Sequence, residues 1–194
     1  MRFLPLLALT LAIALGLGGW TADWAIRRAA DNGSIVVGPW TANPLAGSVD
    51  ADPYAKALLA RTGNLTLGLG EGIAFHAVRD SSGSTLARDC VYQLKGQTPA
   101  ARVWTLAAYD AEGQLIDPGG GRPSWLVSSS LMRNEDNSVE VTVGDGAMSG
   151  NWLALAGEGR FVLVLTLYDT PASSSTGMGR LTLPDLVRGE CRDG

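Results

Sequence analysis

The sequence predicts a mainly β fold, an antiparallel β-sandwich or partly closed barrel with one short helix, preceded by an N-terminal transmembrane helix. An apolar run near the N-terminus is long enough to cross a membrane. Beyond it, many of the chain's 25 glycines and nine prolines separate short apolar runs. Turn signals therefore recur about every 8–12 residues, as in sandwiches and barrels. Helical spacing is clear only once in this part, so no series of helices is present to build a parallel sheet.

The N-terminal segment is expected to be an uncleaved anchor over residues 1–24. No charge interrupts the run from Phe3 to Ala22, which as a helix rises about 30 Å, the thickness of a hydrocarbon core. Trp20 and Trp24 lie where an aromatic belt would form, and Arg27-Arg28 follow.

A cleavable signal peptide is the alternative for this segment. Arg2 would form a minimal charged region, and Gly16-x-Gly18 a small-residue cleavage site. The apolar run is longer than that of a usual signal peptide, and the amphipathic continuation from Asp23 to Ala30 favours the anchor. Either interpretation directs the chain to export.

Two cysteines, Cys90 and Cys191, are the only ones in the chain. In an exported chain such a pair favours a disulfide, with two buried free thiols as the alternative. A loop of this length contributes on the order of 4–5 kcal/mol in the chain-entropy model. The pair therefore favours a location of the domain outside the cytoplasm, in the periplasm if the source is a Gram-negative bacterium.

Residues 25–49 are expected to form a juxtamembrane linker and a first strand, Ile35–Trp40, before a domain over residues 50–194. That domain begins with its one clear helix. Asp52 is the expected N-cap with Pro53 at the first helical position, and Gly63 the expected terminator.

After the helix, apolar residues alternate with a period of two. In the first such run Ile73, Phe75 and Ala77 share one face. The run Trp125–Met132 is expected to pair with Val139–Val143 around a polar turn. The expected strands are Gly72–Arg79, Asp89–Leu94, Arg102–Tyr109, Gln114–Ile116, Trp125–Met132, Val139–Val143, Phe161–Tyr168 and Leu181–Leu183.

The strand Phe161–Tyr168 is expected to form the middle of the core. It is the most apolar run outside the N-terminus and contains no charge, glycine or proline. Such a run is typical of a strand that is buried on both faces.

Several short motifs together resemble one family. They are Asp52-Pro53-Tyr54, Glu71-Gly72, Cys90-Val91-Tyr92, Trp104-Thr105-Leu106 with Tyr109-Asp110, Asn151-Trp152-Leu153, and the run from Phe161 to Leu167-Tyr168-Asp169. The chain from Asp50 to Cys191 resembles the "domain of unknown function 1214" family of membrane-anchored bacterial envelope proteins. The resemblance implies a jelly-roll sandwich and a partner, since members often pair or fuse with a "domain of unknown function 1254" module. It implies no established activity.

No standard catalytic or metal motif is present. His76 is the only histidine, so a Ser-His-Asp relay would have to use it, and the Gly-x-Ser-x-Gly elbow is absent. A zinc site needs three or four ligands, which one histidine and two bonded cysteines cannot supply. Gly68-x-Gly70-x-Gly72 leads into a strand, which favours turn glycines over a phosphate cradle. We therefore expect no metal and no cofactor.

One group of polar and aromatic residues is the candidate site, because such side chains can converge at the mouth of a sandwich. The group is Glu71, Arg102, Trp104, Asn151, Trp152 and Tyr168. In the structural alternative Asn151 ties a turn, Arg102 pairs with Glu71, and the tryptophans belong to the core.

The expected function is that of a membrane-anchored interaction or accessory module. It would sit in the bacterial inner membrane, with its domain in the periplasm and a companion envelope protein as partner. The net charge of −4 and the scattered positive charges argue against nucleic acid. The alternatives are a hydrolase that uses Glu71 and Asp110, if they lie about 5–10 Å apart, and a carbohydrate-binding module built on Trp104 and Trp152.

Overall fold

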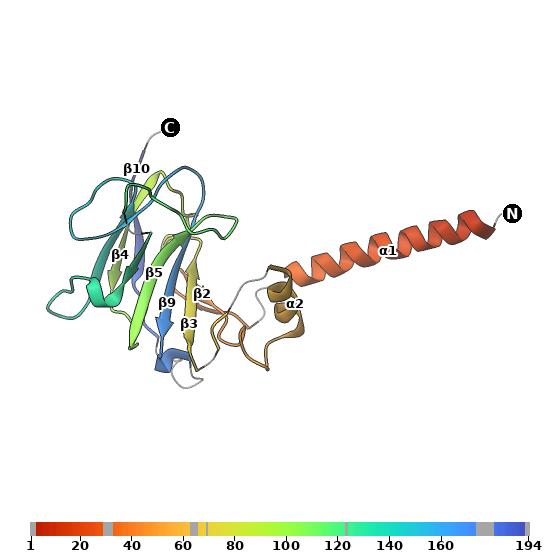
Figure 1. Ribbon diagram of the computed structural model, residues 1–194, viewed down its shortest axis with the longest axis horizontal. Coiled ribbons are helices and arrows are strands. Elements are labelled where there is room, and N and C mark those ends of the chain that lie inside the picture. Colours follow the sequence, from red (N-terminus) through yellow and green to blue (C-terminus); the bar gives the residue numbers. More distant parts are fainter. Residues whose placement is uncertain are drawn as a thin grey trace. The chain divides into compact units, whose positions relative to one another are not determined.

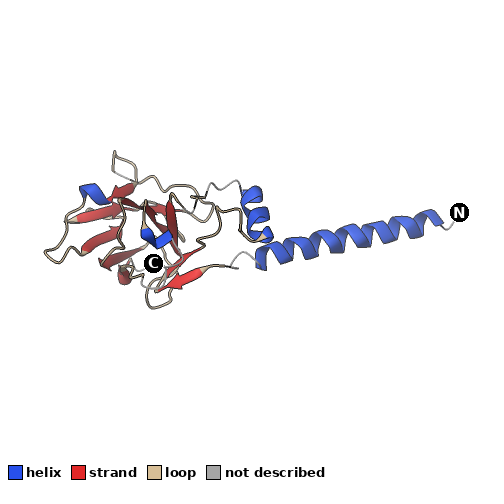
Figure 2. Ribbon diagram, turned by 90° about the horizontal axis from the view of Figure 1, so that it is seen from below, coloured by secondary structure: helices blue, strands red, loops and turns tan. Residues whose placement is uncertain are grey.

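A computed structural model describes residues 3–28, 33–62, 66–68, 70–122, 124–173 and 181–192. The chain divides into two units. The first comprises Met1–Gly33 with Leu45–Thr66, and the second comprises Ser34–Pro44 with Leu67–Gly194. The long helices belong to the first unit, whereas the second consists of strands and loops with two single-turn helices (Figure 2).

The first unit contains the helices α1 (Phe3–Arg28) and α2 (Pro53–Thr62). The part of α1 from Phe3 to Ile26 is apolar and long enough to cross a membrane. The hydroxyls of Thr10 and Thr21 donate to carbonyls one turn earlier, so these polar groups are satisfied within the helix. Such a helix can serve as an anchor or as a signal sequence.

The start of α2 confirms the predicted cap. Asp52 Oδ1 accepts hydrogen bonds from the backbone N–H groups of Tyr54 at 2.9 Å and Ala55 at 3.4 Å. These are the N–H groups that a helix cannot satisfy itself. The expected terminator, Gly63, lies outside the described residues.

The second unit contains two sheets in a sandwich-like arrangement, which confirms the mainly β fold class (Figure 1). The six-stranded sheet has the order β1-β2-β3-β9-β5-β6, and the four-stranded sheet has the order β10-β4-β7-β8. The strands are β1 (Ile35–Val37), β2 (Trp40–Ala42), β3 (Gly72–Ala77), β4 (Cys90–Gly96), β5 (Val103–Tyr109), β6 (Trp125–Val127), β7 (Val139–Gly144), β8 (Asn151–Ala154), β9 (Val162–Tyr168) and β10 (Asp185–Cys191). The single-turn helices are η1 (Ser128–Ser130) and η2 (Pro171–Ser173).

One hydrophobic core joins the inward faces of both sheets. Ile73, Phe75 and Ala77 all point into it, which confirms the predicted period of two in β3. Two of its largest side chains form hydrogen bonds through their polar atoms. Trp40 Nε1 donates to the Pro184 carbonyl at 2.7 Å, and the Tyr92 hydroxyl accepts from the Ala87 N–H at 2.9 Å.

Strand β9 lies between β3 and β5, so its predicted central place is confirmed. The prediction of burial on both faces is wrong. Leu163, Leu165 and Leu167 are fully buried, whereas the alternate residues from Val162 to Tyr168 are only half-buried. Valine and threonine occur in half-exposed strands as well as in buried ones. The composition of the run therefore could not distinguish a strand buried on one face from a strand buried on both.

The predicted pairing of Trp125–Met132 with Val139–Val143 is wrong. Strand β6 is short and pairs with β5 in the six-stranded sheet, while β7 pairs with β4 and β8. Three consecutive serines form η1 and end β6, because serine hydroxyls compete for local backbone bonds. Only the bridge between Arg133 and Val139 remains of the expected hairpin.

Three further differences concern strands at the edges. The expected strand Ile35–Trp40 is a tight hairpin of β1 and β2, because Gly38 adopts a φ of 57°. Residues Leu181–Leu183 are not a strand, and the next strand is β10. Being a largely exposed edge strand with charged residues, β10 lacks the apolar pattern that predicts strands. Strand β8 runs parallel to β7, the exception to an otherwise antiparallel fold.

The cysteine pair is at disulfide distance, as expected. Cys90 begins β4 and Cys191 ends β10, and the two residues face each other in the register of the sheet. Their sulfur atoms lie 1.94 Å apart. The bond joins the last strand of the chain to the first strand of the four-stranded sheet.

Candidate functional site

Three of the candidate residues meet through their backbones at one end of the six-stranded sheet. The Arg102 N–H donates to the carbonyls of Tyr168 at 3.1 Å and Asp169 at 3.3 Å, and the Asp169 N–H donates to the Glu71 carbonyl at 2.9 Å. These bonds continue the ladders that join β3, β9 and β5. The structure therefore brings Glu71, Arg102 and Tyr168 together through strand pairing.

The side chain of Glu71 forms a hydrogen bond within the turn that contains it. Its carboxylate accepts the Gly68 N–H at 2.9 Å. Within the described part of the chain, Glu71 and Arg102 form no ion pair. The expected pairing of these two residues is thus not observed.

Asn151 ties the loop that precedes β7 to the four-stranded sheet, in line with the structural alternative in which it ties a turn. Its Oδ1 accepts the Met132 N–H at 2.8 Å. Its Nδ2 donates to the carbonyls of Met132 at 2.8 Å and Glu140 at 2.9 Å. All polar atoms of the amide are therefore used within the protein.

The two tryptophans do not form a sugar-stacking pair. Trp104 is only 2% exposed and belongs to the core. Trp152 donates its Nε1–H to the Gly144 carbonyl at 2.9 Å, and the Arg122 guanidinium carbon lies 5.9 Å from its ring centroid. A ring that stacks on a sugar needs an open face, which Trp104 lacks.

The carboxylate pair considered for glycosidase chemistry lies at opposite ends of the sheet. Glu71 precedes β3, whose first residue pairs with Tyr168. Asp110 follows β5, whose last residue pairs with Val162. The length of β9 separates them, about 20 Å at 3.3 Å per residue. That distance is too long for two carboxylates that flank one glycosidic bond.

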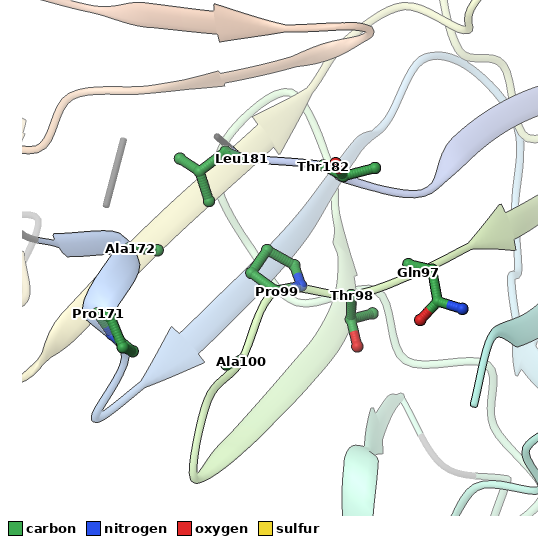
Figure 3. A pocket seen from close by; sticks show the side chains of 8 residues that line it. All are labelled: Gln97, Thr98, Pro99, Ala100, Pro171, Ala172, Leu181 and Thr182. Atoms are coloured by element: carbon green, nitrogen blue, oxygen red, sulfur yellow. The ribbon is translucent and has the colours of Figure 1, made fainter. Parts of the chain in front are cut away.

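A first cavity, of about 220 Å³, lies beside η2. Residues 97–100, Pro171 and Ala172 line it together with Leu181 and Thr182 (Figure 3). None of these described side chains is charged, so they supply no ionisable acid or base to the cavity.

A second cavity, of about 360 Å³, is polar. It lies between residues 98–102, the β5 residue Trp104, the η1 serines Ser128 and Ser129, and the turn that carries Arg133 and Asn137. Two of the six candidate residues, Arg102 and Trp104, line this cavity. Arg133 and the two serines were missed, because only the fold brings them beside the connection between β4 and β5.

A buried ionic network occupies a different position, after β3. Asp80 is 2% exposed, and its Oδ2 lies 3.0 Å from Arg188 Nε. Its Oδ1 accepts the Ser82 N–H at 2.9 Å, the Ser82 hydroxyl at 2.6 Å and the Ser84 N–H at 3.0 Å. Desolvation alone would raise the pKa of Asp80, but these hydrogen bonds and the Arg188 charge outweigh it and lower the pKa.

This network joins the two sheets. The Ser81 N–H donates to the Leu186 carbonyl at 2.8 Å, and the Leu186 N–H donates to the Ser81 hydroxyl at 3.0 Å. The Arg188 guanidinium carbon lies 5.6 Å from the Tyr92 ring centroid. Arg188 comes from β10, far along the chain, so only the fold brings it to this turn.

The outward face of the six-stranded sheet carries no charged side chain. Register and alternation place on this face Val36, Thr41, Ala74, His76, Val103, Thr105, Ala107, Tyr109, Trp125, Val127, Val162, Val164, Thr166 and Tyr168. We call this set the neutral face. His76 reaches solvent there, and desolvation by the surrounding protein lowers its pKa.

No group of three or more metal-ligating side chains occurs among the residues for which positions are described.

Comparison with one solved structure, that of a Vibrio protein, shows the fold. The VPA0106 protein from Vibrio parahaemolyticus matches with a TM-score of 0.58 and 17% identity, over 73% of this chain and 36% of that one. An uncharacterized protein from Burkholderia cenocepacia matches with a TM-score of 0.44 and 17% identity, over 61% of this chain and 29% of that one. The chain thus spans about a third of the length of these proteins. No curated protein matches the chain significantly.

A family model gives a more specific comparison than the solved structures do. The model described as "Protein of unknown function (DUF1214)" matches residues 71–172, just over half of the chain. The match runs from the start of β3 to η2 and includes all six candidate residues. The chain belongs to the DUF1214 family of proteins of unknown function.

Proposed function

We propose that this chain is a membrane-anchored accessory module of the bacterial envelope that works by associating with a partner protein. The observation that carries the proposal is the neutral face. In this proposal residues 1–24 anchor the chain in the inner membrane, residues 25–49 supply a linker and first strand, and residues 50–194 form the periplasmic domain.

The neutral face differs in kind from its counterpart on the other sheet. Lys95 and Glu140 on the four-stranded sheet form an ion pair at 2.6 Å, and Asp185 lies opposite Lys95 in the register. Such charges are typical of a sheet face in contact with water. On the neutral face Trp125 is 53% exposed and Val36 71% exposed, with no charge between them. A broad apolar surface without charge favours an interface over permanent solvation.

The partner we favour is an envelope protein with the companion "domain of unknown function 1254" module. The matched fold occupies 36% of the Vibrio protein, so a relative carries this fold together with further protein in one chain. The apolar helix α1 and the cysteine pair support a location outside the cytoplasm.

Co-purification tests the proposal. The full-length chain is co-expressed with a tagged envelope protein that carries the companion module, and the two are recovered from detergent-solubilised membranes. The variant Trp125→Glu places a charge on the neutral face at an exposed position, so the fold should tolerate it. Val187→Glu on the four-stranded sheet, where the wild-type side chain is 52% exposed, is the matched control.

We expect wild type and Val187→Glu to be retained and Trp125→Glu to be lost, because association would bury the new carboxylate. Circular dichroism confirms that each variant is folded. The proposal fails if the wild-type chain is not retained, or if the two variants behave alike.

A further inference from the structure

We propose that the polar cavity of about 360 Å³ binds a small anion through the guanidinium groups of Arg102 and Arg133. The cavity lies at the end of the sandwich, between the β4–β5 connection and the segment that follows β6. This inference is independent of the neutral face and of any protein partner.

The charge of the cavity points to an anionic ligand. Two arginines line it, and among the described residues no aspartate or glutamate does, although the chain as a whole has a net charge of −4. Most other polar groups on its wall are hydroxyls, those of Thr98, Ser128 and Ser129. Guanidinium groups bind carboxylate, phosphate and sulfate oxygens in pairs of parallel hydrogen bonds.

Neither arginine is neutralised by the described part of the protein. Other arginines have carboxylate partners, such as Arg188 with Asp80 at 3.0 Å and Arg192 with Asp145 at 2.7 Å. Arg133 donates through Nη1 to neutral acceptors, the Asn137 carbonyl at 3.3 Å and the Asn137 Oδ1 at 3.2 Å. The side chain of Arg102 makes no hydrogen bond to another described residue. Both cationic groups therefore remain available to a ligand.

The wall also has more hydrogen-bond donors than it can satisfy. Trp104 lines the cavity, and its buried Nε1–H has no partner among the residues described. Ser128 Oγ accepts the Trp104 backbone N–H at 3.1 Å, which leaves its hydroxyl proton free to donate. Buried donors without partners are uncommon in proteins, and a ligand rich in acceptors would complement this wall.

The backbones that carry the two arginines are held in place. The Arg102 N–H is bound to the end of β9, through Tyr168 and Asp169. Met132, the neighbour of Arg133, is held on both sides of its backbone by the Asn151 amide. A site whose frame is already ordered loses less entropy when it binds. Asn151, one of the sequence candidates, would thus act as a positioning residue.

The volume limits the size of the ligand. Ligand cavities range from about 300 to 1,000 Å³, so this one is at the small end. It suits a single acidic sugar, a sugar phosphate or a smaller oxyanion. The chemistry shared by these ligands is a carboxylate, phosphate or sulfate group that faces two guanidinium groups.

Isothermal titration of the full-length chain in a nonionic detergent tests the inference. The probes are glucuronate, glucose 6-phosphate and inorganic sulfate, with glucose as the neutral counterpart. The variants are Arg102→Gln and Arg133→Gln. The matched control is Arg79→Gln, which removes the same charge away from the cavity. Arg79 follows the last residue of β3, whereas Arg102 lies near the first, and Arg79 Nη1 donates to the Gly83 carbonyl at 2.9 Å.

We expect at least one anion to bind saturably and glucose to bind far more weakly. Each cavity variant should lower the affinity about tenfold, the loss of one charge-assisted contact, and Arg79→Gln should change it less than about twofold. Thermal unfolding of each variant checks that the fold persists. The probe that binds most tightly identifies the acidic group. The inference is overturned if no anion binds saturably, if Arg79→Gln weakens binding as much as Arg102→Gln, or if glucose binds as tightly as glucuronate.

Discussion

Replacing Asp80 by asparagine should destabilise the second unit by at least about 3 kcal/mol. The carboxylate accepts three hydrogen bonds from Ser82 and Ser84, and it faces Arg188 at 3.0 Å. A hydrogen bond to a charged acceptor is roughly twice as strong as a neutral one, so neutralising the acceptor costs about 1 kcal/mol for each of the three bonds. Loss of the ion pair adds to this cost, because the carboxylate is almost fully buried.

The turn around Asp136 provides a matched control. Asp136 Oδ1 accepts the Ser138 N–H at 3.0 Å and the Ser138 hydroxyl at 2.6 Å, the same local pattern as in the Asp80 turn. Asp136, however, is exposed and has no ion-pair partner among the residues described. Water can replace its hydrogen bonds, so Asp136→Asn should change the free energy of unfolding far less than Asp80→Asn.

Urea unfolding of the full-length chain, followed by tryptophan fluorescence, measures both variants. The comparison uses the unfolding midpoint together with its slope, so that a change in the unfolded state is recognised. The reasoning is refuted if Asp80→Asn costs less than about 1 kcal/mol, the value of a single hydrogen bond. Equal losses in Asp80→Asn and Asp136→Asn would refute it as well, since burial would then play no part.

The pKa of Asp80 adds a dependence on pH. Because the folded state lowers this pKa, the ionised carboxylate contributes its full stability above the ordinary aspartate value of about 3.9. That contribution is lost as the pH falls from there through the folded pKa. Wild type should therefore lose stability more steeply than Asp80→Asn over this acidic range, and parallel curves would contradict the assignment.

Two further predictions concern the disulfide and the core. Replacing both Cys90 and Cys191 by serine should lower the free energy of unfolding by about 2–5 kcal/mol, since the bond closes a long loop. Adding reductant should destabilise wild type but not the variant, and a variant as stable as wild type would show that the bond does not form. Leu165→Ala should cost about 3 kcal/mol because the side chain is fully buried. Val164→Ala, the adjacent residue on the neutral face, should cost clearly less in the same assay, and equal losses would show that both faces of β9 are buried.

The local features that were predicted correctly depend on neighbours in sequence. The cap formed by Asp52 and the alternation of Ile73, Phe75 and Ala77 each follow from a few consecutive residues. The predictions that failed depend on distant partners. A run such as Trp125–Met132 indicates that the chain can adopt an extended conformation there. It does not indicate which strand lies beside it.

The candidate site was predictable only in part, for the same reason. Arg102 and Trp104 were singled out as polar and aromatic residues in a strand, and both line the polar cavity. Arg133 lies about thirty positions further along the chain, between the expected strand Trp125–Met132 and the polar turn that follows it. It joins the other two residues only because β6 pairs with β5. Trp152 and Glu71 were grouped with them, but their side chains form local hydrogen bonds and do not line the polar cavity.

The sequence by itself determined the apolar N-terminal helix, the mainly β class, the family and the pairing of Cys90 with Cys191. Each of these depends on composition, on short-range periodicity, or on there being only one way to pair two cysteines. The tertiary structure alone decided that β9 has one half-exposed face, that Asp80 meets Arg188, and that two arginines share a cavity. Those features arise when segments far apart in the chain pair side by side, and strand register is set by the free energy of the whole core rather than by any local motif.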